Sequence, residues 1–187
     1  MSSFDEKASR RVESVYSTID IVTQRKKILE LLAPIKGERI LDLGVGPGFL
    51  TKEIAELVGV ESQISGIDNS EFMIEIAKKR CSYFPSVTFQ ESNATNLPFS
   101  DSEFDAAVVS QVYEYVSEIQ VALSELYRVL KPGGRALIVD TDWDSLVWNA
   151  KDKDKANQIF KVWDQHLFDP NLPSKLSPML LSEGFRI

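Results

Sequence analysis

The sequence predicts an α/β fold in which a doubly wound, mostly parallel sheet carries helices on both faces. Five short apolar runs alternate with segments whose apolar residues recur at helical spacing. Each run is apolar nearly throughout, which is typical of parallel strands buried on both faces. The right-handed crossover rule then makes the sheet doubly wound. No repeat or linker divides the 187 residues, so we expect one domain over 1–187.

The first half of the chain predicts a helix, a strand, a glycine-rich loop, a helix and a strand. Residues 17–33 form the first helix, with Ser17 and Asp20 as a capping box. The apolar residues of its inner face are Ile21, Ile28, Leu31 and Leu32. The run 39–43 is a strand that ends at the glycines of GVGPG. The next helix is marked by Leu50, Ile54, Leu57 and Val58, and the second strand is QISGID (63–68).

The second half continues the alternation. A helix capped by Ser70 has the inner residues Met73, Ile76 and Ala77. The remaining strands are expected at 87–90, 104–110 and 135–140. A helix at 117–130 stops at the PGG of 132–134, and two more helices are expected at 152–167 and about 175–183. Ile159, Phe160, Trp163 and Leu167 are expected to face the core.

Composition excludes several classes of function. The formal net charge is -7 and the basic residues are scattered, whereas a nucleic-acid site needs clustered basic charge. Cys81 is the single cysteine, so neither a disulfide nor a cysteine-based zinc site can form, and we expect no bound metal. The N-terminus is charged, and no apolar run approaches the roughly 20 residues that span a bilayer. We therefore expect a cytoplasmic protein without nucleic-acid partners.

A glycine-rich loop and an acid indicate a nucleoside site. In a doubly wound sheet, ligands bind at the carboxyl ends of the strands, where the loop after the first strand lies. Gly44 suits a tight turn, while Gly46 and Gly48 let a ligand approach the main chain. The following helix offers its N-terminus to an anionic group. Asp68 ends the second strand, where an acid accepts both hydroxyls of a ribose.

Dehydrogenases share these features, but the spacing here is G-x-G-x-G and Phe49 stands where the third glycine of the dinucleotide fingerprint would fall. The chain instead resembles the class I S-adenosylmethionine-dependent methyltransferases, and within them the small-molecule branch of the ubiquinone and menaquinone enzymes. The matching stretches are ILDLGVGPGFLT, SGIDNSEFMIEIAKK, SNATNLPFSDSEFDAAVVSQVYEYV and LYRVLKPGGRALIVD. The resemblance implies a Rossmann-like methyltransferase fold with S-adenosylmethionine as cofactor and a small-molecule substrate.

The resemblance also implies roles for individual residues. Gly44 and Gly46 would line the methionine moiety and Asp68 would hold the ribose, with Asp42 shaping the loop from below. The expected adenine contacts are Asn69, Met73, Asn93 and Ala94, and Gln111 would lie near the sulfonium. Arg25 or Tyr16 would close over the carboxylate. Val45 and Asn93 replace a frequent cysteine and aspartate of the family; the Asn93 carbonyl oxygen can still accept from the adenine amino group.

Candidates for the substrate side follow from topology. After strand four they are Tyr113 and Glu114, and after strand five they are Asp140, Asp142 and Trp143. The acids suit deprotonation of a substrate or pairing with a cationic one, or they are solvated loop residues. His166, Trp163 and Phe160 are interpreted as structural, and Cys81 as a small buried side chain. A base is required only if the nucleophile arrives protonated.

The resemblance divides the chain into an N-terminal helical cap (1–36), a cofactor-binding core (37–140) and a C-terminal helical part (141–187). The family's sheet continues with two further strands, which are incomplete here. RALIVD would then be an apolar edge open to pairing. Truncation is favoured over coverage by a partner subunit or a second copy. The leading hypothesis is methyl transfer from S-adenosylmethionine to a small organic molecule by in-line displacement; the alternatives are an inactive binding module and a nicotinamide oxidoreductase.

Overall fold

The structure is a computed structural model that describes residue 11 and residues 13–187, so most of the charged N-terminal stretch and part of the expected cap lie outside it. Its centre is a five-stranded sheet in the order β3-β2-β1-β4-β5. Every pair of neighbouring strands is parallel. The strands are β1 (Arg39–Leu43), β2 (Gln63–Asp68), β3 (Val87–Glu91), β4 (Phe104–Ser110) and β5 (Leu130–Val139). The predicted α/β fold class is confirmed.

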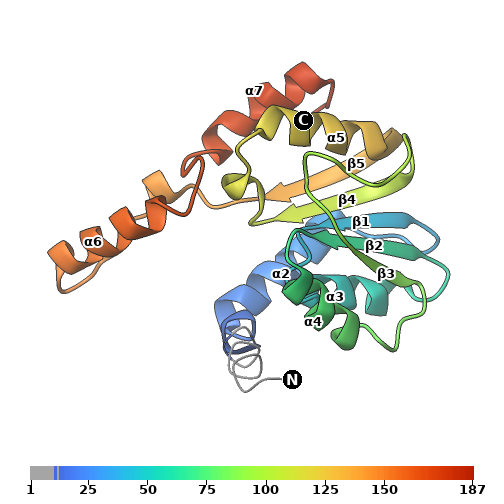
Figure 1. The fold of residues 1–187 in the computed structure, drawn as a ribbon, viewed down its shortest axis with the longest axis horizontal. Coiled ribbons are helices and arrows are strands. Elements are labelled where there is room, and N and C mark those ends of the chain that lie inside the picture. Colours follow the sequence, from blue (N-terminus) through green and yellow to red (C-terminus); the bar gives the residue numbers. More distant parts are fainter. Residues whose placement is uncertain (1–10, 12) are drawn as a thin grey trace.

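Helices cover both faces of this sheet (Figure 1). The helices packed on it are α2 (Ile19–Leu32), α3 (Phe49–Val58), α4 (Glu71–Arg80), α5 (Ile119–Val129) and α7 (Pro173–Glu183), whereas α6 (Lys153–Asp164) extends away from it. One core packs α5 and α7 against side chains of β1 and β4, and the other packs α2 and α3 against the opposite face. Leu41 belongs to the first core and its neighbour Ile40 to the second, as the two-residue period of a strand requires. No helix in the described part of the chain has the length and apolar character to cross a membrane.

The first helix starts later than the sequence predicts. Thr18, and not Ser17, is the N-cap residue of α2, and no side chain caps this end, so the predicted capping box is wrong. The inner face also differs, because Leu31 is 59% exposed while Arg25 is buried with Ile28. An arginine is buried there because its guanidinium bonds Glu53 and the Tyr16 carbonyl.

The strand β5 is an edge, as predicted. It pairs with β4 on one side and ends the sheet on the other. The helix α5 ends at Val129, before the PGG that was expected to stop it, and residues 131–134 form an irregularity between the paired positions Leu130 and Arg135. A groove of about 490 Å³ runs between β5 and α7, lined by apolar residues such as Ile138 and Leu180.

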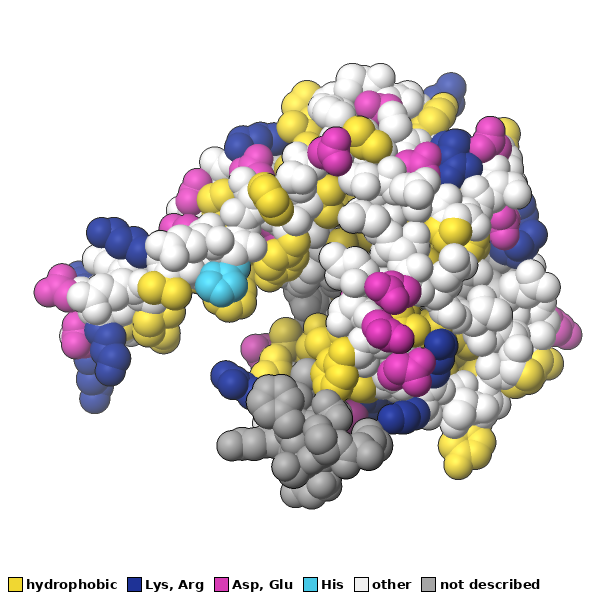
Figure 2. All heavy atoms as spheres, viewed as in Figure 1, with side chains coloured by type: hydrophobic (Ala, Val, Ile, Leu, Met, Phe, Trp, Pro, Cys, Tyr) yellow, Lys and Arg dark blue, Asp and Glu magenta, His cyan; other side chains and the backbone are white. Residues whose placement is uncertain are grey.

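The largest departure from prediction is the segment 143–168, which we call the arm. It comprises the short helix η2 (Trp143–Ser145) and α6, and it projects away from the sheet (Figure 1). Within α6, all of which is described, only Ala156 is buried. Trp163 is 39% exposed and Phe160 is half-buried, so their predicted place in the core is wrong. Figure 2 shows a hollow between the arm and the body of the molecule.

Candidate cofactor and substrate site

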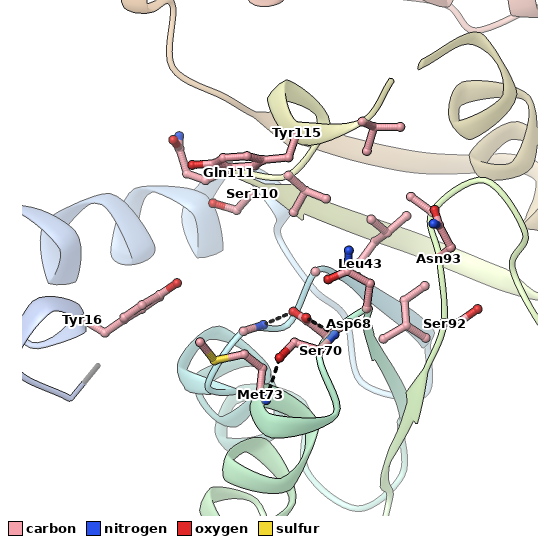
Figure 3. Close-up of a pocket in the computed structure, with 17 residues that line it drawn as sticks. Tyr16, Leu43, Asp68, Ser70, Met73, Ser92, Asn93, Ser110, Gln111 and Tyr115 are labelled. Carbon is pink, nitrogen blue, oxygen red and sulfur yellow. Dashed lines mark hydrogen bonds between the residues drawn. The ribbon is translucent and has the colours of Figure 1, made fainter. Parts of the chain in front are cut away.

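A crevice of about 440 Å³ opens at the carboxyl ends of the central strands (Figure 3). The strand order reverses between β1 and β4, and ligands of doubly wound sheets bind at such a point. The predicted residues that line it are Gly44, Gly46, Asp68, Asn69, Met73, Asn93, Ala94 and Gln111. Residues from four separate segments of the sequence therefore meet in one crevice.

The glycine loop is fixed to the neighbouring strand by its own backbone. The N–H groups of Gly44 and Val45 both donate to the carbonyl of Ile67 in β2, at 2.8 and 2.9 Å. Gly44 has a φ of +79°, and a Cβ on it would lie 2.2 Å from Cγ2 of Val112. A side chain at this position is excluded by both the backbone conformation and the packing. The loop can pass under the end of β4 only because this residue is glycine.

The other two glycines of the loop differ in role. A Cβ on Gly46 would point at the crevice side, 3.3 Å from the hydroxyl of Tyr16. A Cβ on Gly48 would lie 2.9 Å from both Cα and Cβ of Ala77 in α4. Gly48 therefore allows α3 to start close against α4 and does not line the crevice, so its expected role in ligand approach is wrong.

Asp68 connects the loop to the next helix. Its Oδ2 accepts a hydrogen bond from the Gly46 N–H, and its Oδ1 accepts one from the Ser70 N–H, both at 2.9 Å. The carboxylate is thereby held in one orientation at the crevice wall. Each carboxylate oxygen can accept a second hydrogen bond, so the group retains acceptor capacity for two hydroxyls.

Asp42 lies behind the loop and does not line the crevice. It is 2% exposed and accepts a hydrogen bond of 2.5 Å from the Thr51 hydroxyl in α3. Burial raises the pKa of Asp42 to about 6, and the Thr51 hydrogen bond opposes the rise. Asp42 therefore connects β1 to α3 beneath the loop.

The wall formed after β2 and β3 holds the residues expected at an adenine. Asn69 and Met73 come from the start of α4, where the Ser70 hydroxyl accepts from the Met73 N–H. The side-chain oxygen of Asn93 already accepts from the backbone N–H and the hydroxyl of Thr95, both at 3.1 Å. Its free group is therefore the NH₂ donor, which differs from the acceptor role expected from the sequence.

The opposite wall is formed by residues that follow β4 and by Tyr16, which precedes α2. Gln111 has a φ of +57°, and its Oε1 accepts from the Thr141 hydroxyl at 2.8 Å. Tyr16 lines the crevice, where burial, followed by the charge of Asp68, raises its pKa. Arg25 does not line the crevice; its Nη1 donates to the Tyr16 carbonyl at 2.7 Å. Arg25 thus supports Tyr16 and does not itself face a ligand.

The substrate candidates lie beside this wall, around the short helix η1 (Tyr113–Tyr115). Tyr113 is fully buried in the core and does not line the crevice. Glu114 is also fully buried, and its Oε2 accepts from the Trp143 indole N–H at 2.8 Å. Asp140 accepts from the Val112 N–H at 2.9 Å, and burial, with Glu114 as the charged neighbour, raises the pKa of Asp140 to about 7. Asp142 is half-buried.

Sequence reasoning missed some residues of the crevice. The additional lining residues include Ser92, Ser110, Tyr115 and Val116. Ser92 and Ser110 stand at the carboxyl ends of β3 and β4, so the topological rule that selected Asp68 also applies to them. Tyr115 had a weaker signal, because its orientation depends on the turn of η1.

Two other singled-out residues lie outside the crevice. Cys81 is buried, its thiol lies 3.7 Å from the Gly48 carbonyl, and burial raises its pKa to about 11, which leaves it a poor nucleophile. His166 is exposed on the arm, where its Nδ1 lies 3.0 Å from the Val162 carbonyl oxygen. Cys81 is the small buried side chain that the sequence predicts.

Comparison with known proteins identifies the family. Residues 35–181 match the model of a family described as a methyltransferase domain. The chain belongs to this family. It is 31% identical over 136 residues to a demethylmenaquinone methyltransferase of Staphylococcus epidermidis, covering 73% of this chain and 56% of that protein. It is 32% identical over 177 residues to the O-methyltransferase rstn1 of Aspergillus nomiae, covering 91% and 75%.

A solved structure agrees with the methyltransferase fold. Phosphoethanolamine N-methyltransferase 2 of Haemonchus contortus, solved with S-adenosyl-L-methionine, matches with a TM-score of 0.71 and 25% identity over 87% of this chain and 36% of that one. The chain spans about half the length of several curated relatives that it matches. The family found by comparison is therefore the one that the motifs of the sequence resemble.

Proposed function

We propose that this methyltransferase domain binds S-adenosylmethionine in the crevice and transfers its methyl group to a small organic molecule. The observation that carries this proposal is the hydrogen bond from the Gly46 N–H to Asp68. It joins the glycine loop to a fixed carboxylate at one wall of the crevice, at the switch point of the sheet. The names of the relatives, which include quinone and O-methyltransferases, support the same class of reaction.

The residues fit this cofactor. A volume of about 440 Å³ lies within the range of roughly 300–1,000 Å³ that is usual for small-ligand pockets. Asp68 would accept the ribose hydroxyls and Met73 would flank the adenine, while the NH₂ of Asn93 would donate to a ring nitrogen at the base edge. Gly44 and Gly46 would line the methionine moiety. The absence of a side chain at Gly46 leaves space for it in front of Tyr16, because a Cβ there would lie close to the Tyr16 hydroxyl.

The cofactor supplies a methyl group made electrophilic by a sulfonium. The chain has to place a nucleophile in line with that methyl group and to exclude water. Good orientation alone can lower the activation barrier by about 7–11 kcal/mol. Gln111 and Tyr115 line the crevice and would face the methyl acceptor. Burial, followed by the charge of Glu114, raises the pKa of Tyr115 to about 12, so its hydroxyl stays protonated.

Incubation with labelled cofactor and a metabolite extract tests the proposal. The purified chain, S-adenosylmethionine labelled in the methyl group and a small-molecule extract should yield a labelled product whose mass identifies the acceptor. A variant with Asp68→Ala should give no such product above background. Tight calorimetric binding of NADH, together with absence of S-adenosylmethionine binding, would instead favour an oxidoreductase and contradict the proposal.

For the substrate side, we propose that Glu114 and Asp142 act together with Asp140, and that Tyr113 acts from behind them. Glu114 and Tyr113 are fully buried, whereas Asp142 is half-buried. The carboxyl ends of β4 and β5 thus carry three acids beside the crevice wall that contains Gln111. Asp142 is more exposed than Glu114, so we expect the substrate to contact Asp142 directly.

We further propose that two copies of the chain associate through β5. Support comes from the unpaired edge of this strand and from the apolar groove beside it, which includes Ile138 and Leu180. An exposed edge of this kind favours pairing with another strand. Light scattering after size-exclusion chromatography should give the mass of a dimer, and a monomer mass at every concentration would contradict this proposal.

A further inference from the structure

Four buried oxygen atoms around η1 have no hydrogen-bond partner among the described residues. They are Tyr113 Oη, Glu114 Oε1, Asp140 Oδ2 and Asp142 Oδ1. Buried polar atoms in folded proteins nearly always have partners, and leaving one without costs about 1–3 kcal/mol. Four such atoms at the ends of two neighbouring strands indicate a group that the protein takes from outside.

Three of these residues are electrostatically coupled, and the fourth, Asp142, precedes Trp143, which donates to Glu114. Asp140 is the charge that acts on Tyr113, and Glu114 is the charge that acts on Asp140. Both acids also act on Tyr115, which lines the cofactor crevice. We call Tyr113, Glu114, Asp140 and Asp142 the acid cluster. These four residues do not line the crevice itself; Tyr115, which follows Glu114 in the chain, does, and Asp140 lines the groove between β5 and α7.

The protein supplies no cation to this cluster. Among the ion pairs of the described residues, none includes Glu114, Asp140 or Asp142. A metal ion does not fit either, because no group of three or more His, Cys, Asp or Glu side chains in the described part of the chain is arranged to hold one. An organic group that carries positive charge or N–H donors would supply partners for these oxygens.

Two tryptophans complete the surroundings. Trp143 donates its indole N–H to Glu114, and its ring lies 5.2 Å from that of Trp163 with 50° between the planes. The electron-rich face of an indole attracts organic cations more strongly than the face of a tyrosine or phenylalanine ring. Trp143 and Asp142 are half-buried, and Tyr115 is 42% exposed. These three residues are partly open to solvent, so a ligand would reach the acid cluster past them.

We propose that the acid cluster and the Trp143–Trp163 pair bind a protonated amine on the methyl acceptor. The ammonium N–H groups would donate to the free oxygens of Asp140 and Asp142, and the aromatic rings would cover its hydrocarbon part. A carboxylate or phosphate on the acceptor would face three acids and be repelled. This inference rests on the proposed function, because it places the amine beside the crevice that is assigned to the cofactor.

Three probes that share a benzene ring and differ in charge test the inference. Benzylamine is a cation at neutral pH, benzyl alcohol is neutral and benzoate is an anion. Binding is measured by ligand-observed NMR on the full chain, with and without S-adenosylhomocysteine. We expect benzylamine to bind about 10-fold to 100-fold more tightly than benzyl alcohol, as for one charged hydrogen bond. Benzoate should be the weakest of the three.

Two variants locate the binding. Asp140→Asn should remove most of the preference for the amine over the alcohol, and Trp163→Leu should weaken benzylamine through the exposed arm without disturbing the sheet. Glu61→Gln is the matched control, because it removes one acid charge at an exposed position near the amino ends of the strands. This control should bind all three probes as the parent does.

Several outcomes would overturn the inference: benzoate binding as tightly as benzylamine, no detectable binding of benzylamine, or an unchanged preference in Asp140→Asn. Calorimetry with S-adenosylhomocysteine on the same samples separates this inference from the proposed function. Cofactor binding without an amine preference would reject the amine site alone, whereas absence of cofactor binding would reject the proposed function.

Discussion

Replacing Asp68 by alanine is the most direct test of the crevice. In the structure this carboxylate accepts from the backbone N–H groups of Gly46 and Ser70, and it retains acceptor capacity for two ribose hydroxyls. Each hydrogen bond to a charged group is worth about 1.5–3 kcal/mol, so two amount to about 3–6 kcal/mol. At ~1.4 kcal/mol per decade, the dissociation constant of the cofactor should rise by about 100-fold or more.

The assay is isothermal titration calorimetry with S-adenosylhomocysteine, accompanied by thermal unfolding. Asp68→Asn keeps one acceptor oxygen and should fall between the parent and the alanine variant. The matched control is Glu91→Ala, because Glu91 is the exposed acid that pairs in register with Asp68 at the end of β3 and does not line the crevice. An Asp68→Ala variant that is folded and binds as tightly as the parent would refute the assigned site.

Three further predictions concern the loop, a buried acid and the arm. Gly44→Ala should abolish cofactor binding and lower the melting temperature, because its Cβ would lie 2.2 Å from Val112. Asp140→Asn should stabilise the protein above about pH 7. The native pKa of Asp140, about 7, exceeds the unfolded value of about 3.9, so in the parent stability falls as pH rises between these values, by up to about 4 kcal/mol. Trp143→Phe should cost about 1–3 kcal/mol, because Glu114 Oε2 loses the partner that it has in a fully buried position.

Each of these predictions has its own check. For the loop, Gly37→Ala carries a φ of +89° with nothing among the described residues within 4 Å of a Cβ, so it measures the backbone strain without the clash. For Asp140, urea unfolding between about pH 5 and 8 should show a smaller decline in the variant than in the parent; parallel curves would contradict the assigned pKa. For the arm, Trp148→Phe removes a tryptophan that is 54% exposed, and its melting temperature should stay at the parent's value.

The sheet could be predicted closely because its signal is local. A strand buried on both faces favours a short, mainly apolar run. The predicted segments 39–43, 63–68 and 104–110 match β1, β2 and β4 residue for residue. The crevice could be predicted because the carboxyl ends of parallel strands meet at one edge of the sheet, which brings Asp68 to Gly46.

Other features cannot be predicted from sequence patterns alone. Periodicity finds the apolar face of α6 but does not say which surface covers it, so Trp163 was wrongly assigned to the core. The loop pattern does not say which neighbour each glycine faces, so the packing of Gly48 on Ala77 was missed. The residue type of Asn93 gives both a donor and an acceptor, and only the hydrogen bonds from Thr95 show that its oxygen is occupied.

Glu114 explains why the arm and the crevice should act together. Its carboxylate accepts from Trp143 at one end of the arm, and its carbonyl accepts from the N–H groups of Phe168 and Asp169 at the other end, at 2.9 and 3.4 Å. The next residue, Tyr115, lines the crevice. Both ends of the arm are hydrogen-bonded to Glu114, the residue before Tyr115. A displacement of the arm should therefore shift Tyr115 in the wall of the crevice. The loop and Asp68 lie on other strands, so changes in the arm should affect the choice of acceptor more than the affinity for the cofactor.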